Sequence, residues 1–158
     1  MKKLPIGIQT FKKIINNNYC YVDKTAFIKN LFDEGEYYFL SRPRRFGKSL
    51  FLSTLKSAFQ GEKILFQNLF LENNWDWGTN WPVIHISFGA GVCRSVEDIR
   101  ITFDEILYDH ARENSIEFIK KSLKGKFAEL ISSLYEKYGQ QVVILIDEYD
   151  KPILDNID

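Results

Sequence analysis

The chain has 158 residues, of which 45% are hydrophobic and 15% aromatic, which is enough apolar side chain for the core of one domain. Its 21 Lys and Arg residues balance 21 Asp and Glu residues, so the formal net charge is zero. A neutral chain has no overall positive field to hold a polyanion. Any nucleic-acid site would therefore have to be a local basic patch.

Cysteine usage and hydropathy exclude several further classes of protein. The two cysteines, Cys20 and Cys93, form no C-x-x-C pair, which argues against a zinc site and a disulfide framework. The opening residues lack the continuous apolar core of a signal peptide, and no segment reaches the length of a membrane span. We therefore expect a cytoplasmic protein without a membrane partner.

The first part of the chain predicts a short helix, a strand and a longer helix. Asp23 is a candidate N-cap for a helix that carries apolar residues at 27, 28, 31 and 32 and ends at Gly35. Residues 37–41 read as a buried strand. From Gly47 onward, apolar residues recur on one helical face until Gly61 closes the helix.

A less regular stretch follows over residues 61–80, and it is rich in tryptophan. Trp75, Trp77 and Trp81 stand among Asn, Gly and Asp residues. Three tryptophans could mark a ligand platform, but packing beneath a long loop is the commoner use of such residues. We expect packing.

The second part predicts strand 82–88, two helices with apolar stripes over 96–107 and 116–138, and strand 142–147. The continuous apolar run of the last strand predicts burial on both faces, as in a parallel sheet covered by helices. Strands alternating with helices predict an α/β fold with a three-layer architecture.

The sequence SRPRRFGKSL, residues 41–50, places Gly47, Lys48 and Ser49 where a predicted strand passes into a helix. Unpaired N–H groups and the positive dipole end of such a helix favour an anion. A glycine lets the backbone approach phosphate, Lys48 can reach the β- and γ-phosphates, and the Ser49 hydroxyl can bind Mg²⁺. The candidate nucleotide-binding residues are Arg44, Arg45, Phe46, Gly47, Lys48, Ser49 and Leu50.

Two acids at the end of the last strand complete a second candidate motif. Asp147 and Glu148 stand at its carboxyl end, which is where ligands bind in open α/β sheets. Asp147 suits the Mg²⁺ shell through a water, and Glu148 suits the catalytic base that positions an attacking water. Alternatively, the two acids only solvate the strand end. Two motifs in the right order make nucleotide binding the better interpretation.

The runs LPIGIQTF, YCYVDKT, LSRPRRFGKSLFLSTLK, WPVIHISF and VVILIDEYDKPIL together resemble the AAA-ATPase-like domain family. This is a mainly bacterial group of P-loop proteins, often joined to a C-terminal nuclease domain of the restriction-endonuclease type. The resemblance covers nearly the whole chain. It implies that Lys48 and Ser49 contact phosphate and magnesium, that Asp147 is the Walker B acid and that Glu148 is the catalytic acid.

The loop departs from a standard P-loop, because Arg42 stands where the first glycine is usual; the family shares this feature. Pro43 biases Arg42 toward extended geometry, so the loop need not wrap phosphate with every backbone amide. Arg44 and Arg45 could supply guanidinium donors instead. The alternatives are that they form ordinary ion pairs or, with less support from a neutral chain, a basic patch for nucleic acid.

ATP and Mg²⁺ are therefore the expected ligands, with Mg²⁺-dependent ATP hydrolysis as the expected reaction. Two alternatives stay open: a nucleotide-gated interaction module with negligible turnover, and a nucleic-acid-associated accessory to a nuclease outside this chain. His85 and His110 lack partners at ligand spacing and are expected to be structural.

The predicted strand order has a consequence for the sheet. It resembles the P-loop division in which strands 37–41 and 142–147 are not neighbours, and the strand between them comes later in the chain. We therefore expect residues 1–158 to be the N-terminal part of a larger P-loop sheet whose later strands are missing. Its exposed strand edges would then invite self-association.

Overall fold

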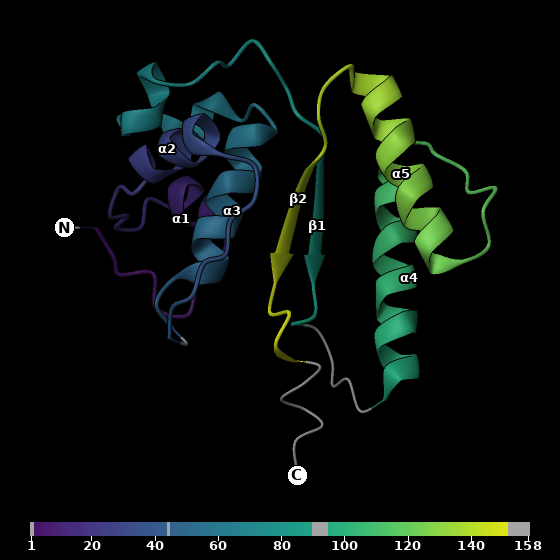
Figure 1. The fold of residues 1–158 in the computed structure, drawn as a ribbon. Coiled ribbons are helices and arrows are strands. Elements are labelled where there is room, and N and C mark those ends of the chain that lie inside the picture. The colour runs from purple at the N-terminus through teal and green to yellow at the C-terminus, as the bar shows by residue number, and fades with distance from the viewer. Residues whose placement is uncertain (1, 44, 90–94, 152–158) are drawn as a thin grey trace. The chain divides into compact units, whose positions relative to one another are not determined.

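The structure is a computed structural model that describes residues 2–43, 45–89 and 95–151. The chain divides into two compact units, Met1–Asn80 and Trp81–Asp158, which are treated one at a time below. Figure 1 labels the main elements of both. Arg44 and Cys93, which the sequence analysis considered, lie outside the described residues.

The first unit is helical. It contains the α-helices α1 (Phe11–Asn16), α2 (Ala26–Glu34) and α3 (Lys48–Phe59), followed by the short 3₁₀ helices η1 (Lys63–Phe66) and η2 (Phe70–Asn73). The α3 helix matches its prediction. Its inner face buries Leu55, Ala58 and Phe59, with Phe11 and Phe66 also in the core of the unit. Phe11 and Phe66 pack with their ring centroids 5.0 Å apart.

Asp23 does not cap α2, which begins three residues later. Its carboxylate instead accepts backbone hydrogen bonds from Thr25 (2.8 Å) and from Phe70 (2.7 Å). The buried Thr25 hydroxyl accepts a further bond from the backbone N–H of Leu71 (3.1 Å). We call these three bonds the Asp23–Thr25 clasp. Because two of its three bonds join residues 46 and 47 positions apart, sequence periodicity could not reveal the clasp.

The clasp also sets the charge state of Asp23. Partial burial by itself would raise the pKa of the carboxyl group, but the hydrogen bonds from Phe70 and Thr25 outweigh it and lower the pKa below its ordinary value. Asp23 is therefore a carboxylate whose ionised form is stabilised by the fold.

The strand predicted over residues 37–41 is wrong: these residues form no strand. Tyr37 is 92% exposed and Phe39 71% exposed, so the apolar run is not buried. The Tyr38 hydroxyl donates a hydrogen bond back to the carbonyl of Leu31 (2.7 Å). A strand needs a neighbour to pair its backbone groups, and the described residues of the first unit contain no other strand.

Packing accounts for two of the three tryptophans, as expected. The Trp75 ring lies against Phe59 and Phe32, with ring centroids 5.3 and 5.0 Å away. Trp77 packs against Phe66 at 5.0 Å and donates its indole N–H to the carbonyl of Glu72 (2.8 Å). These two rings are half-buried parts of the core of the first unit rather than an open platform.

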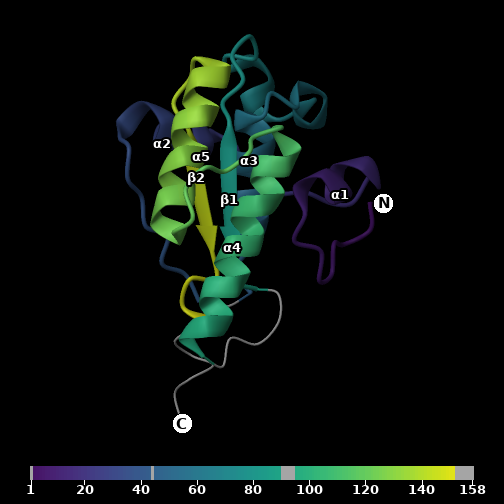
Figure 2. The ribbon, with the colours of Figure 1, turned by 90° about the vertical axis from the view of Figure 1, so that its right-hand side faces the viewer.

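The second unit is α/β, as predicted. Strands β1 (Val83–Ser87) and β2 (Val143–Asp147) form a two-stranded parallel sheet in which Val83 pairs with Val143 and Ser87 with Asp147. Helices α4 (Val96–Glu113) and α5 (Leu123–Tyr138) lie together on one side of this sheet, as Figures 1 and 2 show. The buried core between them and the sheet is Ile84, Ile86, Leu107, Ala111, Leu130 and Leu134.

The α5 helix begins seven residues later than its apolar stripe predicts. Ser122 caps it by accepting a hydrogen bond from the N–H of Gly125 (3.1 Å). The preceding residues turn back along the helix, and Glu129 accepts hydrogen bonds from the N–H groups of Ile119 and Lys120 (3.1 and 3.0 Å). Apolar residues before Ser122 follow the helical spacing without being helical.

The β2 strand is not buried on both faces, which corrects the prediction from its apolar run. Leu145 is buried, but Ile144 and Ile146 are 40% and 50% exposed. By register these two residues share a face with Ile84 and Ile86 of β1, which are fully or almost fully buried. Helices α4 and α5 therefore cover β1 and leave this part of β2 uncovered.

The two edges of the sheet differ. Val143 donates its N–H to the carbonyl of Pro82 and Phe88 donates to that of Asp147, so residues 144 and 146 turn their backbone groups to the other edge of β2. Within the described chain, nothing pairs with that edge. On the free edge of β1, the buried His110 ring nitrogen Nε2 accepts the N–H of His85 (3.0 Å). This agrees with a structural role for the His110 side chain.

No helix in the described ranges is both long enough and apolar enough to cross a membrane.

Candidate functional site

The loop before α3 ends in two left-handed residues. Arg45 has φ of 67° and Gly47 has φ of 78°. A Cβ at position 47 would meet nothing within 4 Å, so glycine is favoured there by its backbone angle rather than by lack of space. The first bond of the helix runs from the N–H of Phe51 to the carbonyl of Gly47 (2.9 Å).

The amino end of α3 has unsatisfied backbone donors. No side chain caps the helix, and the first turn contains no acidic residue. The N–H groups of Lys48, Ser49 and Leu50 have no acceptor among the described residues. Helix ends of this kind favour an anion, because the donors and the helix dipole both point outward. This end of α3 can therefore hold a phosphate group.

Lys48 is tied to the start of the same loop. Its ammonium donates a 2.7 Å hydrogen bond to the carbonyl of Arg42. The bond is exposed, so a phosphate oxygen arriving at the helix end could take over the ammonium. Phe46, in the same loop, is 64% exposed.

Arg45 forms no ion pair within the part of the chain that the structure describes. The ordinary ion-pair alternative therefore has no support for Arg45. Its guanidinium is exposed and available to a ligand. Arg44, the other arginine of the prediction, lies outside the described residues.

The acidic pair lies where β2 ends. Asp147 closes the strand and is 9% exposed, and its Oδ1 atom accepts the N–H of Glu148 (3.0 Å). Glu148 takes the left-handed conformation with φ of 52°, which turns the chain sharply out of the strand. Within the described residues Oδ2 of Asp147 accepts no hydrogen bond, which leaves it for a water or a cation.

Two neighbours of Glu148 were not among the predicted site residues. A Cβ on Gly89, just after β1, would lie 2.7 Å from the Oε2 atom of Glu148. Lys151 donates its ammonium to the carbonyl of Gly89 (2.9 Å). Register could have revealed this proximity, since parallel strands end together, but only once the pairing of β1 with β2 was known.

Each predicted group of site residues falls within one unit. Phe46 to Leu50 belong to the first unit, and Asp147 and Glu148 to the second. Within the described residues no three His, Cys, Asp or Glu side chains gather as a metal site. Ser49 in the first unit and Asp147 in the second each carry an oxygen of the kind that Mg²⁺ commonly binds.

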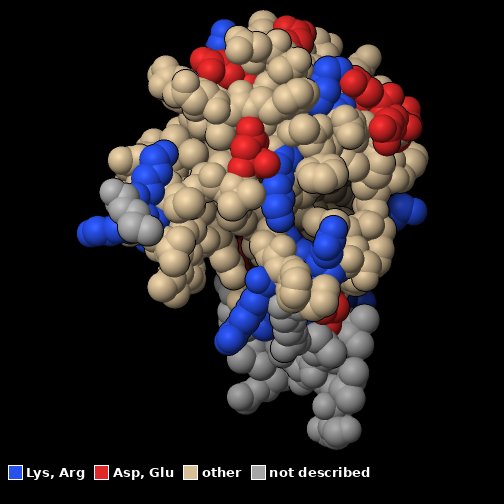
Figure 3. Space-filling view, turned by 90° about the vertical axis from the view of Figure 1, so that its left-hand side faces the viewer, with Lys and Arg blue, Asp and Glu red and all other residues tan. Residues whose placement is uncertain are grey.

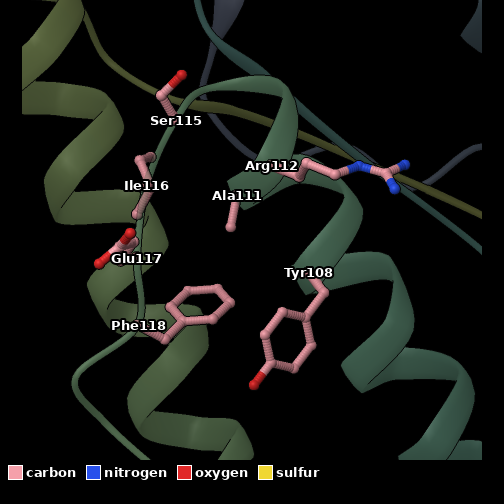
Figure 4. Close-up of a pocket in the computed structure, with 7 residues that line it drawn as sticks. All are labelled: Tyr108, Ala111, Arg112, Ser115, Ile116, Glu117 and Phe118. Atoms are coloured by element: carbon pink, nitrogen blue, oxygen red, sulfur yellow. The ribbon is translucent and has the colours of Figure 1, made fainter.

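Other surfaces offer weaker sites. Figure 3 shows one face on which Lys and Arg side chains lie among acidic side chains and a larger uncharged surface. A shallow hollow in the second unit is lined by Tyr108, Ala111, Arg112, Ser115, Ile116, Glu117 and Phe118. In Figure 4 the Tyr108 and Phe118 rings lie next to each other in an edge-to-face arrangement, while Arg112, which pairs with Asp109 (3.1 Å), points away from them. Neither surface gathers polar groups that converge on a ligand.

Comparisons with known proteins identify the family of the chain. A curated protein of Azotobacter chroococcum mcd 1, described as "Uncharacterized protein in vnfD 5'region", is 49% identical over 157 residues. The match covers 99% of this chain but only 30% of that protein. No solved structure matches the chain. A family model described as "Predicted AAA-ATPase" matches residues 5–158, and the chain belongs to this AAA-ATPase-like family.

Proposed function

We propose that the chain binds ATP at the amino end of α3 and hydrolyses it to ADP and phosphate with Mg²⁺. The observation that carries the proposal is the open helix end, where three N–H groups, Lys48 and Ser49 stand together behind the left-handed Gly47. Membership of a family of predicted AAA-ATPases supports ATP as the nucleotide.

The loop would bind phosphate through backbone N–H groups and the Lys48 ammonium. The N–H groups of Lys48, Ser49 and Leu50 would hold phosphate oxygens, and the Lys48 ammonium would exchange the Arg42 carbonyl for a phosphate. The exposed Arg45 would add a guanidinium donor. These donors compensate for the missing first glycine of a standard P-loop.

The acidic pair would supply the second half of the chemistry. Bound Mg²⁺ neutralises phosphate charge, and Ser49 and Asp147 would hold it, Asp147 through a water. Glu148 would accept a hydrogen bond from the attacking water and orient it in line with the γ-phosphate.

The proposal also includes a three-layer P-loop sheet in a larger ATPase, of which this chain forms the N-terminal part. The open edge of β2 and the uncovered Ile144 and Ile146 support it, because a further strand and its covering helix would bury them. The matched region is 30% of the Azotobacter relative, so that protein is long enough to contain further strands and helices.

The test of nucleotide binding is calorimetry of ATP with the Lys48→Ala variant. Loss of one charge-assisted contact, about 1.5–3 kcal/mol, should weaken binding at least about tenfold. Lys56→Ala is the matched control, because it removes the same charge from the last turn of the same helix. Equal affinity of Lys48→Ala and the parent protein would exclude this assignment.

Two further measurements separate the alternatives. Phosphate release under Mg²⁺ distinguishes an ATPase from a nucleotide-gated interaction module, which would bind ATP without turnover. Salt-dependent DNA binding in the absence of ATP would instead favour the nucleic-acid accessory.

A further inference from the structure

The turn that follows β2 folds over the end of β1. The last bond of the ladder belongs to the pair of Ser87 with Asp147 and runs from the N–H of Phe88 to the carbonyl of Asp147 (3.3 Å). The chain then turns at Glu148, and the N–H of Lys151 bonds to the carbonyl of Glu148 (3.1 Å). A closed turn beginning at Glu148 therefore lies beside the residues that leave β1.

Lys151 ties this turn to β1. Its ammonium donates a 2.9 Å hydrogen bond to the carbonyl of Gly89, a residue 62 positions earlier in the chain. The two strand ends are thus joined once beyond the ladder, through the Lys151 side chain. A tie of this kind limits how far the turn can move away from the sheet.

Gly89 provides the space that the Glu148 side chain occupies. A Cβ at position 89 would lie 2.7 Å from Oε2 of Glu148 and 3.1 Å from its carboxyl carbon. Cβ atoms essentially never approach other atoms as closely as 2.7 Å, so any side chain at position 89 would push the carboxylate away. The effect of a side chain here would be to displace the carboxylate at the end of the flexible Glu148 side chain, because the backbone angle of Gly89 does not itself demand glycine.

We propose that Lys151 is a positioning residue for Glu148, and that the bare backbone of Gly89 is the surface against which the carboxylate is set. The proposal rests on the hydrolytic function proposed above. Lys151 would hold the turn, Gly89 would leave room, and Glu148 would face the water in one arrangement rather than several. A catalytic group misplaced by about 1 Å can cost about 100-fold in rate, so the effect should fall on kcat.

The experiment compares Lys151→Met, Lys151→Arg and Gly89→Ala in the full chain. Lys137→Met is the matched control, because Lys137 makes the same exposed bond to a backbone carbonyl, that of Asn114 (2.7 Å), away from the acidic pair. Lys151→Met and Gly89→Ala should lower kcat about tenfold or more, while the Kd for ATP changes less than about twofold. Lys151→Arg should recover most of the rate, and Lys137→Met should keep it.

A second readout does not depend on turnover. In Lys151→Met the backbone amide NMR signals of Glu148 and Gly89 should shift and their order parameters should fall, whereas Lys137→Met leaves them unchanged. If these signals do not change, or if kcat is kept in Lys151→Met, the positioning role is refuted. If the signals change but the parent protein does not hydrolyse ATP, the proposed hydrolysis is refuted. The bond between Lys151 and Gly89 would then hold the turn without a role in catalysis.

Discussion

Replacing Asp23 by alanine should loosen the first unit by removing the acceptor of two backbone donors. The N–H groups of Thr25 and Phe70 would lose bonds of 2.8 and 2.7 Å to a carboxylate. Bonds to a charged partner contribute about 1.5–3 kcal/mol each, but Asp23 is exposed and water can replace part of each bond. We therefore expect the free energy of unfolding to fall by about 1–3 kcal/mol in total.

Thermal unfolding followed by circular dichroism would measure the loss. For a chain of this size, Tm should drop by about 2–4 °C for each kcal/mol. Asp33→Ala is the control: within the described residues its carboxylate pairs with Lys29 alone, at the surface of α2, and such surface pairs contribute about 0–1 kcal/mol. Hydrogen exchange at the Phe70 amide should accelerate in Asp23→Ala and not in Asp33→Ala.

The pH dependence gives the sharper test. Because the fold lowers the pKa of Asp23, the stabilisation is fully present above the ordinary carboxyl pKa of about 3.9 and is lost as pH falls through the lower folded value. The difference in stability between the parent and Asp23→Ala should therefore shrink as the solution is acidified below about pH 4. Equal melting temperatures at pH 7, or an undiminished difference in strong acid, would refute the clasp as a stabilising feature.

Three further predictions concern the acidic pair and the sheet edge. Glu148→Gln should still bind ATP but lose most phosphate release, because an amide is a poor acceptor for the proton of water. If this variant releases phosphate at the rate of the parent protein, another residue activates the water. Asp147→Asn should raise the Mg²⁺ concentration needed for half-maximal activity, and an unchanged Mg²⁺ titration would exclude it from the metal shell. Ile146→Lys should weaken any concentration-dependent self-association seen by analytical ultracentrifugation, since charge on an exposed strand edge discourages pairing; an unchanged association constant would place the interface elsewhere.

The sequence by itself determined the features that depend on near neighbours. The apolar periodicities of α3 and α4 and the apolar runs of β1 and β2 predicted these elements within a few residues, because each pattern reflects which side of a helix or strand is buried. The glycine before α3 and the acids after β2 could be found from their order in the chain. The family was recognisable from the same local motifs.

Tertiary structure decided whatever depends on a partner distant in sequence. Residues 37–41 have strand-like composition, but a strand forms only where another backbone pairs with it, and here Tyr37 and Phe39 stay exposed. Asp23 reads as a helix cap until Phe70 lies beside it, and the apolar run of β2 does not show that the helices cover only β1. Gly89, Glu148 and Lys151 lie together because β1 and β2, about 60 residues apart in the chain, pair in parallel register. Local sequence patterns do not show which distant strands pair.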